Sequence, residues 1–294
     1  MKERLDSSTG IKVYKHAKLA EYTSFRIGGH ADYLVRVYSK KQLVHILQVV
    51  KKNDLKFFLI GAGTNLLFGD NGFRGVVVKM GGIFNRLVHD HGTFICGPAL
   101  LLNTLVKRAS DLGYGGVEFL AGIPGTIGGA VKGNAGAWGN SIGEIIERVI
   151  ILDKNLAEKE LTPHDVKFSY RSSGIDDRSI ITSVTMKLKK KSNAKIRQVI
   201  KENLRLRKQR QPDGFSAGSF FKNPPGDSAG KLIEACGLKG CRIGDAIVSP
   251  KHGNFIINLG KAKASDVLEL AKKIQKTVYT RTGIRLEPEV RVIK

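Results

Sequence analysis

Residues 116–139 read GVEFLAGIPGTIGGAVKGNAGAWG, a stretch dominated by glycine and other small residues. Eleven glycines fall within the 31 residues from Gly113 to Gly143, and after Glu118 only Lys132 is charged in the quoted stretch. Such a segment cannot fill a core with its own side chains. Its backbone can instead lie close against a large planar partner, or it can form a tightly turned structural loop. The composition favours a segment that lies against a planar ligand, and a structural loop is the alternative.

A smaller glycine cluster follows a predicted strand. Phe57–Ile60 is apolar and leads into the loop Gly61–Leu67, and Gly75–Lys79 predicts a second strand. Apolar residues within 43–50 recur at i, i+3, i+4 and i+7, which predicts an amphipathic helix. A G-x-G turn after a strand lets backbone N–H groups converge on an anion such as a pyrophosphate. It is neither a Rossmann fingerprint nor a P-loop, because Leu66 replaces the third glycine and no Gly-Lys-Ser/Thr ending is present. A plain tight turn is the alternative.

The charge of the chain is strongly positive. The 294 residues carry a formal net charge of +23, and 41% are hydrophobic, which supplies a packed core and argues against disorder. The length suggests two domains or three. Residues 190–210 hold nine basic residues and one acid, with apolar residues interleaved as in an amphipathic helix. We interpret them as a helix with a solvated basic face. Without a nucleic-acid-binding motif, no nucleic-acid partner is expected, and the charge suits small anionic ligands.

Neither a membrane nor a metal is expected to be a partner. No apolar run reaches the roughly 18 residues of a membrane span, and Met1–Lys15 lacks the apolar stretch of a signal peptide. The three cysteines, Cys96, Cys236 and Cys241, show no metal-ligand spacing. These features predict a soluble cytosolic protein with reduced thiols.

Further motifs are spread over nearly the whole chain. They are Tyr22–Gly29, Gly72–Gly75, Tyr170–Ser173, Ala217–Pro224, Lys251–Phe255 and Leu286–Arg291. Together with the two glycine-rich segments, in this order, they resemble the UDP-N-acetylenolpyruvoylglucosamine reductases of bacterial peptidoglycan synthesis. Their number and order, rather than any single motif, make the resemblance specific.

The resemblance implies an α+β fold of the vanillyl-alcohol-oxidase (PCMH) type. Two subdomains would bind FAD, and a C-terminal α/β domain would bind the substrate. We expect the first FAD-binding subdomain at residues 1–80 and the second at 81–205, completed by 285–294. The substrate-binding domain is expected at 206–284.

The family's reaction uses non-covalent FAD, with NADPH as co-substrate. It reduces the enolpyruvyl group of UDP-N-acetylglucosamine enolpyruvate to UDP-N-acetylmuramate. By resemblance, Arg171 would stabilise the charge that develops on the substrate carboxylate. Ser219, biased by the nearby Lys222, would donate a proton to C2. Glu289 would assist this step, which requires a raised pKa of its carboxyl group. The alternatives are a structural salt bridge for Arg171, a turn or N-cap serine for Ser219, and a surface pairing with Arg291 for Glu289.

The remaining expected site residues bind cofactor or substrate. For the cofactor they are Gly61, Ala62, Gly63, Thr64, Asn65, Leu66, Gly122, Pro124, Gly125, Thr126, Gly128, Gly129, Asn134, Ala135 and Gly136. For the substrate they are Tyr170, Lys222 and Asn223.

Some positions depart from the family pattern. They are Gly133, Trp138, Asp245 and Gly253, and none is an expected catalytic residue. The interval from Arg171 to Gln211 is short and leaves little room for the tyrosine-bearing loop that one subgroup closes over its substrate. The chain therefore resembles the compact subgroup that lacks this loop, and a monomer is expected.

One competing enzyme class shares the fold. A flavin oxidase would oxidise an alcohol or a sugar lactone with oxygen. The motifs that carry Ser219 and Glu289 argue against it, because oxidation of an alcohol needs no proton donor at C2. A basic nucleic-acid-binding protein is the third hypothesis and depends only on the charge.

Overall fold

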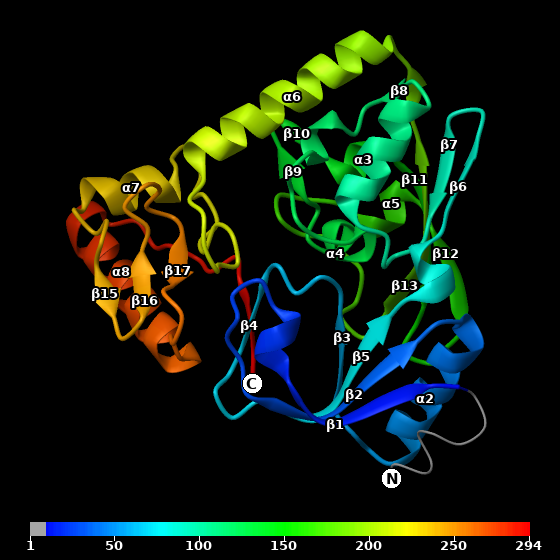
Figure 1. Cartoon of the computed structure of the whole chain (residues 1–294), viewed down its shortest axis with the longest axis horizontal. Coiled ribbons are helices and arrows are strands. Elements are labelled where there is room, and N and C mark those ends of the chain that lie inside the picture. The colour runs from blue at the N-terminus through cyan, green and yellow to red at the C-terminus, as the bar shows by residue number, and fades with distance from the viewer. Residues whose placement is uncertain (1–9) are drawn as a thin grey trace. The chain divides into compact units, whose positions relative to one another are not determined.

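A computed structural model describes residues 10–294, and its contacts divide the chain into two compact units (Figure 1). Unit 1 contains the described residues up to Tyr14, together with Tyr33–Ala62 and Gly75–Arg207. Unit 2 contains Lys15–Asp32, Gly63–Arg74 and Lys208–Lys294. The chain therefore enters and leaves each unit repeatedly, and short segments from the first quarter of the sequence belong to unit 2.

A four-stranded sheet, which lies mainly in unit 1, packs against helix α2. These elements are β1 (Lys12–Lys18), β2 (His30–Val37), α2 (Lys40–Lys52), β3 (Phe57–Ile60), β5 (Phe73–Met80) and the 3₁₀-helix η2 (Gly82–Asn85), with strand order β1-β2-β5-β3. The Ser39 side chain caps α2 by accepting the Gln42 N–H at 3.3 Å. The predicted helix and both predicted strands are confirmed, and the apolar face of α2 is buried. Strands β3 and β5 are parallel, with Ile60 opposite Lys79.

Unit 1 also contains an antiparallel five-stranded sheet, in the order β12-β11-β13-β7-β6. Its strands are β6 (Leu87–Asp90), β7 (Thr93–Cys96), β11 (Ile146–Leu152), β12 (Glu158–Leu161) and β13 (Ile180–Lys187). The helices that accompany it are α3 (Leu102–Asp111), η3 (Glu118–Leu120), α4 (Ile127–Lys132), η4 (Ile142–Ile145), α5 (Pro163–Val166) and α6 (Asn193–Arg210). Two short pairs complete the unit: β8 (Tyr114–Gly115) with β14 (Lys189–Lys190), and β9 (Gly136–Ala137) with β10 (Asn140–Ser141).

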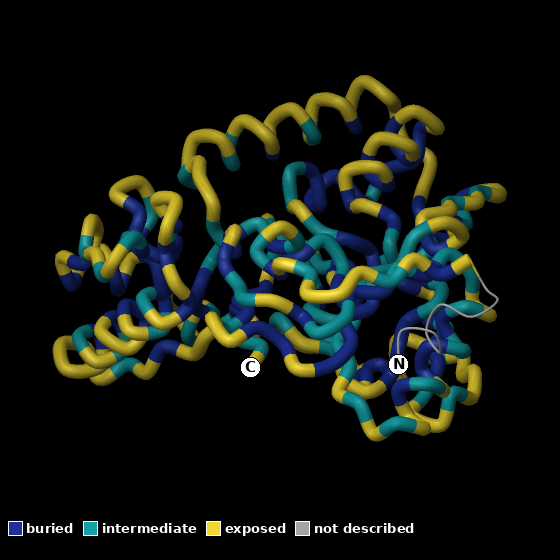
Figure 2. The backbone as a smooth tube through the Cα atoms, turned by 60° about the horizontal axis from the view of Figure 1, so that its bottom comes forward, coloured by how far each residue is buried: buried dark blue, intermediate teal, exposed yellow. Residues whose placement is uncertain are grey.

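Unit 2 has its own hydrophobic core. Its elements are η1 (Leu19–Tyr22), β4 (Leu66–Phe68), α7 (Ala229–Ala235), β15 (Arg242–Ile243), β16 (Ala246–Val248), β17 (Ile256–Asn258), α8 (Ala264–Thr282) and β18 (Arg291–Ile293). The apolar residues of α8 recur at helical spacing and are buried, and the helix ends before Gly283, whose φ of +71° suits glycine. Buried positions recur along α8 and the neighbouring strands in Figure 2.

The C-terminal residues differ from the sequence-based division. The prediction joins 285–294 to 81–205, whereas the structure places these residues in unit 2. Leu286 and Val290 pack in the core of unit 2, and β18 pairs in parallel with β4. Unit 1 itself contains two hydrophobic clusters, one around α2 and one around the antiparallel sheet. The assignment of three domains to separate functions stays a prediction.

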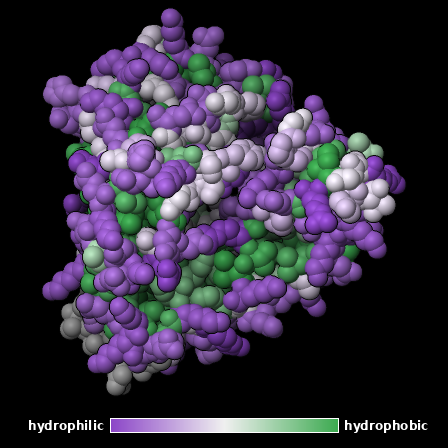
Figure 3. Space-filling view, turned by 180° about the vertical axis from the view of Figure 1, so that it is seen from behind, coloured by the Kyte–Doolittle hydropathy of each residue, from purple (hydrophilic) through white to green (hydrophobic). Residues whose placement is uncertain are grey.

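Hydrophilic side chains cover much of the face shown in Figure 3. Over residues 10–294, every helix is too short or too polar to cross a membrane. Within the same residues, no three His, Cys, Asp or Glu side chains come together as potential metal ligands.

Candidate active site

The two glycine-rich segments meet in unit 1. A Cβ atom on Gly61 would lie 2.6 Å from Thr126 Oγ1, so only glycine fits at the end of β3 without displacing that hydroxyl. Thr126 is the N-cap of α4, and its Oγ1 accepts the Gly129 N–H at 3.4 Å. Gly128 donates to Pro98 O at 2.8 Å, which holds the start of α4 in place. The start of α4 and the Gly61 turn thus lie directly against each other.

A half-buried lysine supports the Gly61 turn. Lys79 Nζ, on β5, donates to Gly61 O at 2.7 Å. Burial lowers the pKa of Lys79, and the positive charge of Arg36 lowers it further. The turn thus lies against a basic side chain, which is the setting that an anion bound by its N–H groups would need.

Left-handed backbone recurs along the segment from 116 to 139. Gly122 has φ +75°, Gly139 has φ +79°, and the non-glycine residues Asn134 and Trp138 have φ +40° and +57°. In the Gly61–Leu67 loop Gly63 has φ +68°, and a Cβ there would collide with Tyr22 O. Only glycine combines this conformation with such close approach. The positions predicted to lie against FAD therefore fit a group that contacts backbone rather than side chains.

Side chains of helix α6 form hydrogen bonds with the start of the glycine-rich segment. Asn203 Nδ2 donates to Glu118 O at 2.9 Å, and Arg207 Nε donates to Ala121 O at 2.8 Å. A second Arg207 nitrogen donates to Phe119 O at 3.3 Å. Burial lowers the pKa of Arg207, and the charge of Arg171 acts in the same direction. The predicted helix is confirmed, but its inner face carries polar side chains that bind backbone carbonyls.

Arg171 occupies a tight turn in unit 1. Ser169 and Ser172 exchange two backbone hydrogen bonds of 3.1 Å, so Tyr170 and Arg171 form the tip between them. Arg171 has φ +55°, an unusual conformation for a long side chain. Its NH1 donates to Gly136 O at 3.1 Å, and its guanidinium lies 5.3 Å from the centroid of the Tyr170 ring. The predicted charge-stabilising residue is thus attached directly to the glycine-rich segment.

Ser219 and Glu289 lie on neighbouring backbone segments of unit 2. Glu289 N donates to Phe220 O at 2.8 Å, and Lys222 N donates to Glu287 O at 2.8 Å. On the other side, Ser219 forms an isolated bridge with Phe255. Residues 219–222 therefore form an extended segment between two backbone partners, and two of the three predicted catalytic residues lie on neighbouring segments.

Two predicted substrate-binding residues, Lys222 and Asn223, lie on or next to this segment. Lys222 Nζ lies 3.5 Å from Glu287 Oε2, and Asn223 Oδ1 accepts the Ala229 N–H at 3.0 Å, at the start of α7. From the Gly61–Leu67 loop, Asn65 Nδ2 donates to Glu289 O at 3.1 Å. Asn65 thus stabilises the backbone segment that carries Glu289. The roles of all these residues stay predictions.

Sequence reasoning missed two residues that hold the site in place. Lys79 is the lone charge at the end of the apolar run from 75 to 79, and that position was the available signal. Asn254 belongs to the Lys251–Phe255 motif. Its side chain accepts from Phe221 N at 2.9 Å and donates to Phe221 O at 2.8 Å. An asparagine inside a family motif indicates a specific contact, but the sequence does not identify the partner.

Other residues considered from the sequence have structural surroundings. The His252 ring lies 5.0 Å from the Phe255 ring, and burial lowers the pKa of His252. Its packing against Phe255 fits a structural role. Cys96 is completely buried, and burial raises the pKa of its thiol to about 12. A neutral, enclosed thiol is unsuited to nucleophilic attack.

The departures from the family pattern have different local settings. A Cβ on Gly133 would meet nothing closer than 3.5 Å, so a larger residue fits there. A Cβ on Gly253 would lie 2.8 Å from Glu234 Cγ. Trp138 lies over the Arg207 guanidinium, 5.6 Å from ring to charge, and Asp245 accepts the Lys261 N–H at 3.1 Å.

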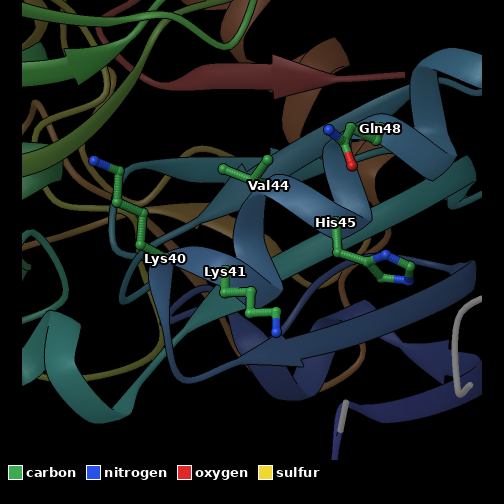
Figure 4. Close-up of a pocket in the computed structure, with 5 residues that line it drawn as sticks. All are labelled: Lys40, Lys41, Val44, His45 and Gln48. Carbon is green, nitrogen blue, oxygen red and sulfur yellow. The ribbon is translucent and has the colours of Figure 1, made fainter. Parts of the chain in front are cut away.

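One shallow hollow lies outside these segments. It is lined by Lys40, Lys41, Val44, His45 and Gln48, all from α2 (Figure 4). The side chains spread apart instead of converging, and Lys40 forms an ion pair with Glu158. None of the predicted site residues lines it, so we assign it no ligand.

Comparison with known proteins identifies the class first. An FAD-binding domain model matches residues 31–155. A BBE-like 1 variant from Physcomitrella patens shares the fold, with a TM-score of 0.51 and 18% identity over 64% of this chain and 44% of that one. The shared fold and the matching domain model place this chain in the class of proteins with an FAD-binding domain of this fold. The predicted α+β fold of the vanillyl-alcohol-oxidase type and the predicted FAD cofactor are confirmed.

The family follows from closer relatives. The model for the UDP-N-acetylenolpyruvoylglucosamine reductase C-terminal domain matches residues 210–293. The chain is 40% identical to UDP-N-acetylenolpyruvoylglucosamine reductase 2 of Symbiobacterium thermophilum, over 96% of this chain and 92% of the relative. A crystal structure of the reductase from Thermus caldophilus matches with a TM-score of 0.84 and 37% identity, covering 97% and 99% of the two chains. The chain belongs to the UDP-N-acetylenolpyruvoylglucosamine reductase family.

Proposed function

We propose that this enzyme reduces the enolpyruvyl group of UDP-N-acetylglucosamine enolpyruvate to UDP-N-acetylmuramate, using NADPH, in peptidoglycan precursor synthesis. We further propose that it acts as a monomer in the cytoplasm. FAD, when bound, carries the hydride between NADPH and the substrate. The observation that carries the proposal is the attachment of Arg171 to Gly136, because it puts a permanent cation on the segment expected to line the flavin.

Backbone would hold most of the cofactor. We assign the pyrophosphate to the turn at Gly61, Ala62 and Gly63, supported from below by Lys79. The segment around Gly125, with Thr126, Gly128 and Gly129, would follow the rest of the dinucleotide. Support comes from the missing side chains: a Cβ on Gly61 or Gly128 would press on Thr126 or Pro98.

Arg171 would bind the substrate carboxylate. Its hydrogen bond to Gly136 O orients the planar guanidinium, whose fork matches a carboxylate. Because negative charge grows on that carboxylate as the hydride arrives, attraction to Arg171 increases toward the transition state. The left-handed backbone at Arg171 supports this role, since strained residues persist where surrounding contacts hold them and often occur at functional sites.

Ser219 would deliver the proton to C2, and Glu289 would share in that transfer. The backbone pairing of Phe220 with Glu289 supports a joint role, because it keeps the two residues on adjacent segments. Lys222 follows Ser219 by three residues, and its ammonium would attract the anionic substrate. Tyr170 and Asn223 would contact other parts of the UDP-sugar.

Two half-reactions test the proposal. Under anaerobic conditions NADPH should bleach the visible flavin spectrum, and the enolpyruvyl UDP-sugar should restore it. A Ser219→Ala variant should bleach at the wild-type rate but recover more slowly by at least about a hundredfold, the usual range for removing a proton donor. Equal losses in both half-reactions would contradict the assignment of Ser219. Rapid recovery with oxygen alone would favour the oxidase of the same fold.

A further inference from the structure

We infer that Asn134 is a positioning residue for Arg171 and that its side chain does not serve as a cofactor ligand. The inference depends on the role proposed above for Arg171. It concerns how that guanidinium is held where the reaction needs it. Asn134 is one of the residues predicted to bind FAD, and its side chain is bonded to the turn that carries Arg171.

Both ends of the Asn134 amide are bonded to protein groups. Asn134 is 7% exposed. Its Oδ1 accepts the Gly143 N–H at 3.1 Å, and its Nδ2 donates to Ser169 O at 2.9 Å. A buried amide with its oxygen and its nitrogen engaged in this way is a structural connector.

The bond to Ser169 acts directly on the Arg171 turn. Ser169 pairs with Ser172, and only Tyr170 and Arg171 lie between them. The second attachment, from Arg171 NH1 to Gly136 O, reaches the same glycine-rich segment two residues beyond Asn134. The turn is therefore anchored at its base and at its tip to one short piece of backbone.

The backbone of the turn needs such anchoring. Arg171 has φ +55°, and residues in sparsely populated conformations cost about 1–3 kcal/mol each unless their surroundings hold them. Loss of the bond from Asn134 would let the turn relax and move the guanidinium. A displacement of about 1 Å can cost about a hundredfold in rate when orientation matters.

Asn134 is itself left-handed, with φ +40°, a conformation that asparagine and aspartate tolerate better than most residues. Asn134→Asp keeps that tolerance and the acceptor for Gly143, but it replaces the donor to Ser169 O with a carboxylate oxygen. Asn134→Gly removes the whole amide without backbone strain. The two substitutions thus separate the hydrogen bond from the backbone conformation.

The test uses the holoenzyme with Asn134→Asp, Arg171→Ala and the double variant. We expect FAD affinity, measured by flavin fluorescence, and bleaching by NADPH to stay within about twofold of wild type. Recovery by the enolpyruvyl UDP-sugar should slow at least about tenfold, and the double variant should be little slower than Arg171→Ala, because coupled residues are not additive. Amide hydrogen exchange should quicken at Ser169 and Ser172.

Asn140→Asp is the matched control, because exposed Asn140 also donates its side-chain amide to a backbone carbonyl, that of Trp138 at 3.0 Å, and this bond does not involve the Arg171 turn. It should leave all four measurements unchanged. If Asn134→Asp fails to fold, Asn134→Gly carries the same expectations. Loss of FAD from the variant, or additive losses in the double variant, would overturn the inference. Unchanged recovery in Asn134→Asp alone would overturn it while the proposed function stands, whereas unchanged recovery in Arg171→Ala would overturn both.

Discussion

One asparagine side chain binds the turn of Arg171, and another binds the segment of Ser219. The two differ in the number of bonds that they make and in their surroundings. Asn134 makes a single bond to the base of an exposed turn in unit 1. Asn254, which is 3% exposed, binds both the N–H and the C=O of Phe221 in unit 2. Its own carbonyl also accepts the Phe220 N–H at 2.8 Å.

The difference lies in what surrounds each attachment. Phe220 and Phe221 are at most 2% exposed and belong to the core of unit 2, so the segment of Ser219 is held by burial as well as by hydrogen bonds. The Arg171 turn has a tip that is 56% exposed at Tyr170, and a few polar contacts hold it. Substitutions in unit 2 should therefore lower stability, whereas those near the glycine-rich segment should mainly impair binding and catalysis.

The largest effect on stability is expected from Asn254→Ala. It leaves the N–H and C=O of Phe221 buried without their partner, and each such group costs about 1–3 kcal/mol. The free energy of unfolding, measured with urea, should fall by about 2–4 kcal/mol. The exposed Asn140→Ala should change it by less than about 0.5 kcal/mol. Similar losses for both variants would remove the contrast between the units.

Gly61→Ala tests the other side of the comparison. The added Cβ would lie 2.6 Å from Thr126 Oγ1, so the turn must shift where we place the pyrophosphate. FAD affinity should fall about tenfold or more, equivalent to about 1.4 kcal/mol, with a smaller loss of stability. Gly133→Ala, whose Cβ has open space, is the control. If Gly61→Ala keeps its FAD affinity but unfolds more readily, Gly61 has a purely structural role.

A smaller effect is expected at Asp70. Its carboxylate accepts the Ala264 and Ser265 N–H groups at 2.7 and 3.0 Å, so it caps α8 from a distant part of the sequence. Asp70→Ala should lower the stability of unit 2 by about 1 kcal/mol, since capping by a side chain and the helix dipole both contribute. Thermal unfolding of the variant, compared with the exposed Asp213→Ala, measures this. No difference between them would mean that water replaces the cap.

The smallest expected effect is on the pH dependence of the stability of unit 2. Burial lowers the pKa of His252, so the folded state prefers the neutral ring. The neutral His252 ring therefore contributes stability above about pH 6.5, the ordinary pKa of histidine. This stability is lost as the pH falls through the lower pKa of His252 in the folded protein. The midpoint of thermal unfolding of wild type should drop more between pH 7 and pH 5 than that of His252→Gln. Parallel pH curves would contradict this.

Local features of the fold could be predicted from the sequence, and distant contacts could not. The helix over 43–50, the strands at 57–60 and 75–79 and the buried stripe of α8 follow from periodicity, which depends on neighbouring residues. The same periodicity places Asn203 and Arg207 on α6 but does not reveal that they bind carbonyls of residues 118–121.

The candidate site shows the same limit. The glycine clusters indicated backbone contact with a ligand, and the family motifs supplied the residue roles. The link from Asn134 to Ser169 spans 35 residues, and the pairing of β4 with β18 spans more than 200. The residues around one end of such a contact do not predict the residues at the other end, because these contacts depend on how the whole chain folds.

The interleaved units also set the order in which a growing chain can complete itself. Once Arg207 has been synthesised, all segments of unit 1 exist. The segments 15–32 and 63–74 must still wait for 208–294, because buried Phe25 and Leu67 pack in the core of unit 2 with residues from that later stretch. After Arg207, these apolar side chains therefore wait for the 87 residues of 208–294, which are made at roughly 5–20 residues per second. Interrupted synthesis in that interval would leave a folded unit 1 that carries two aggregation-prone segments.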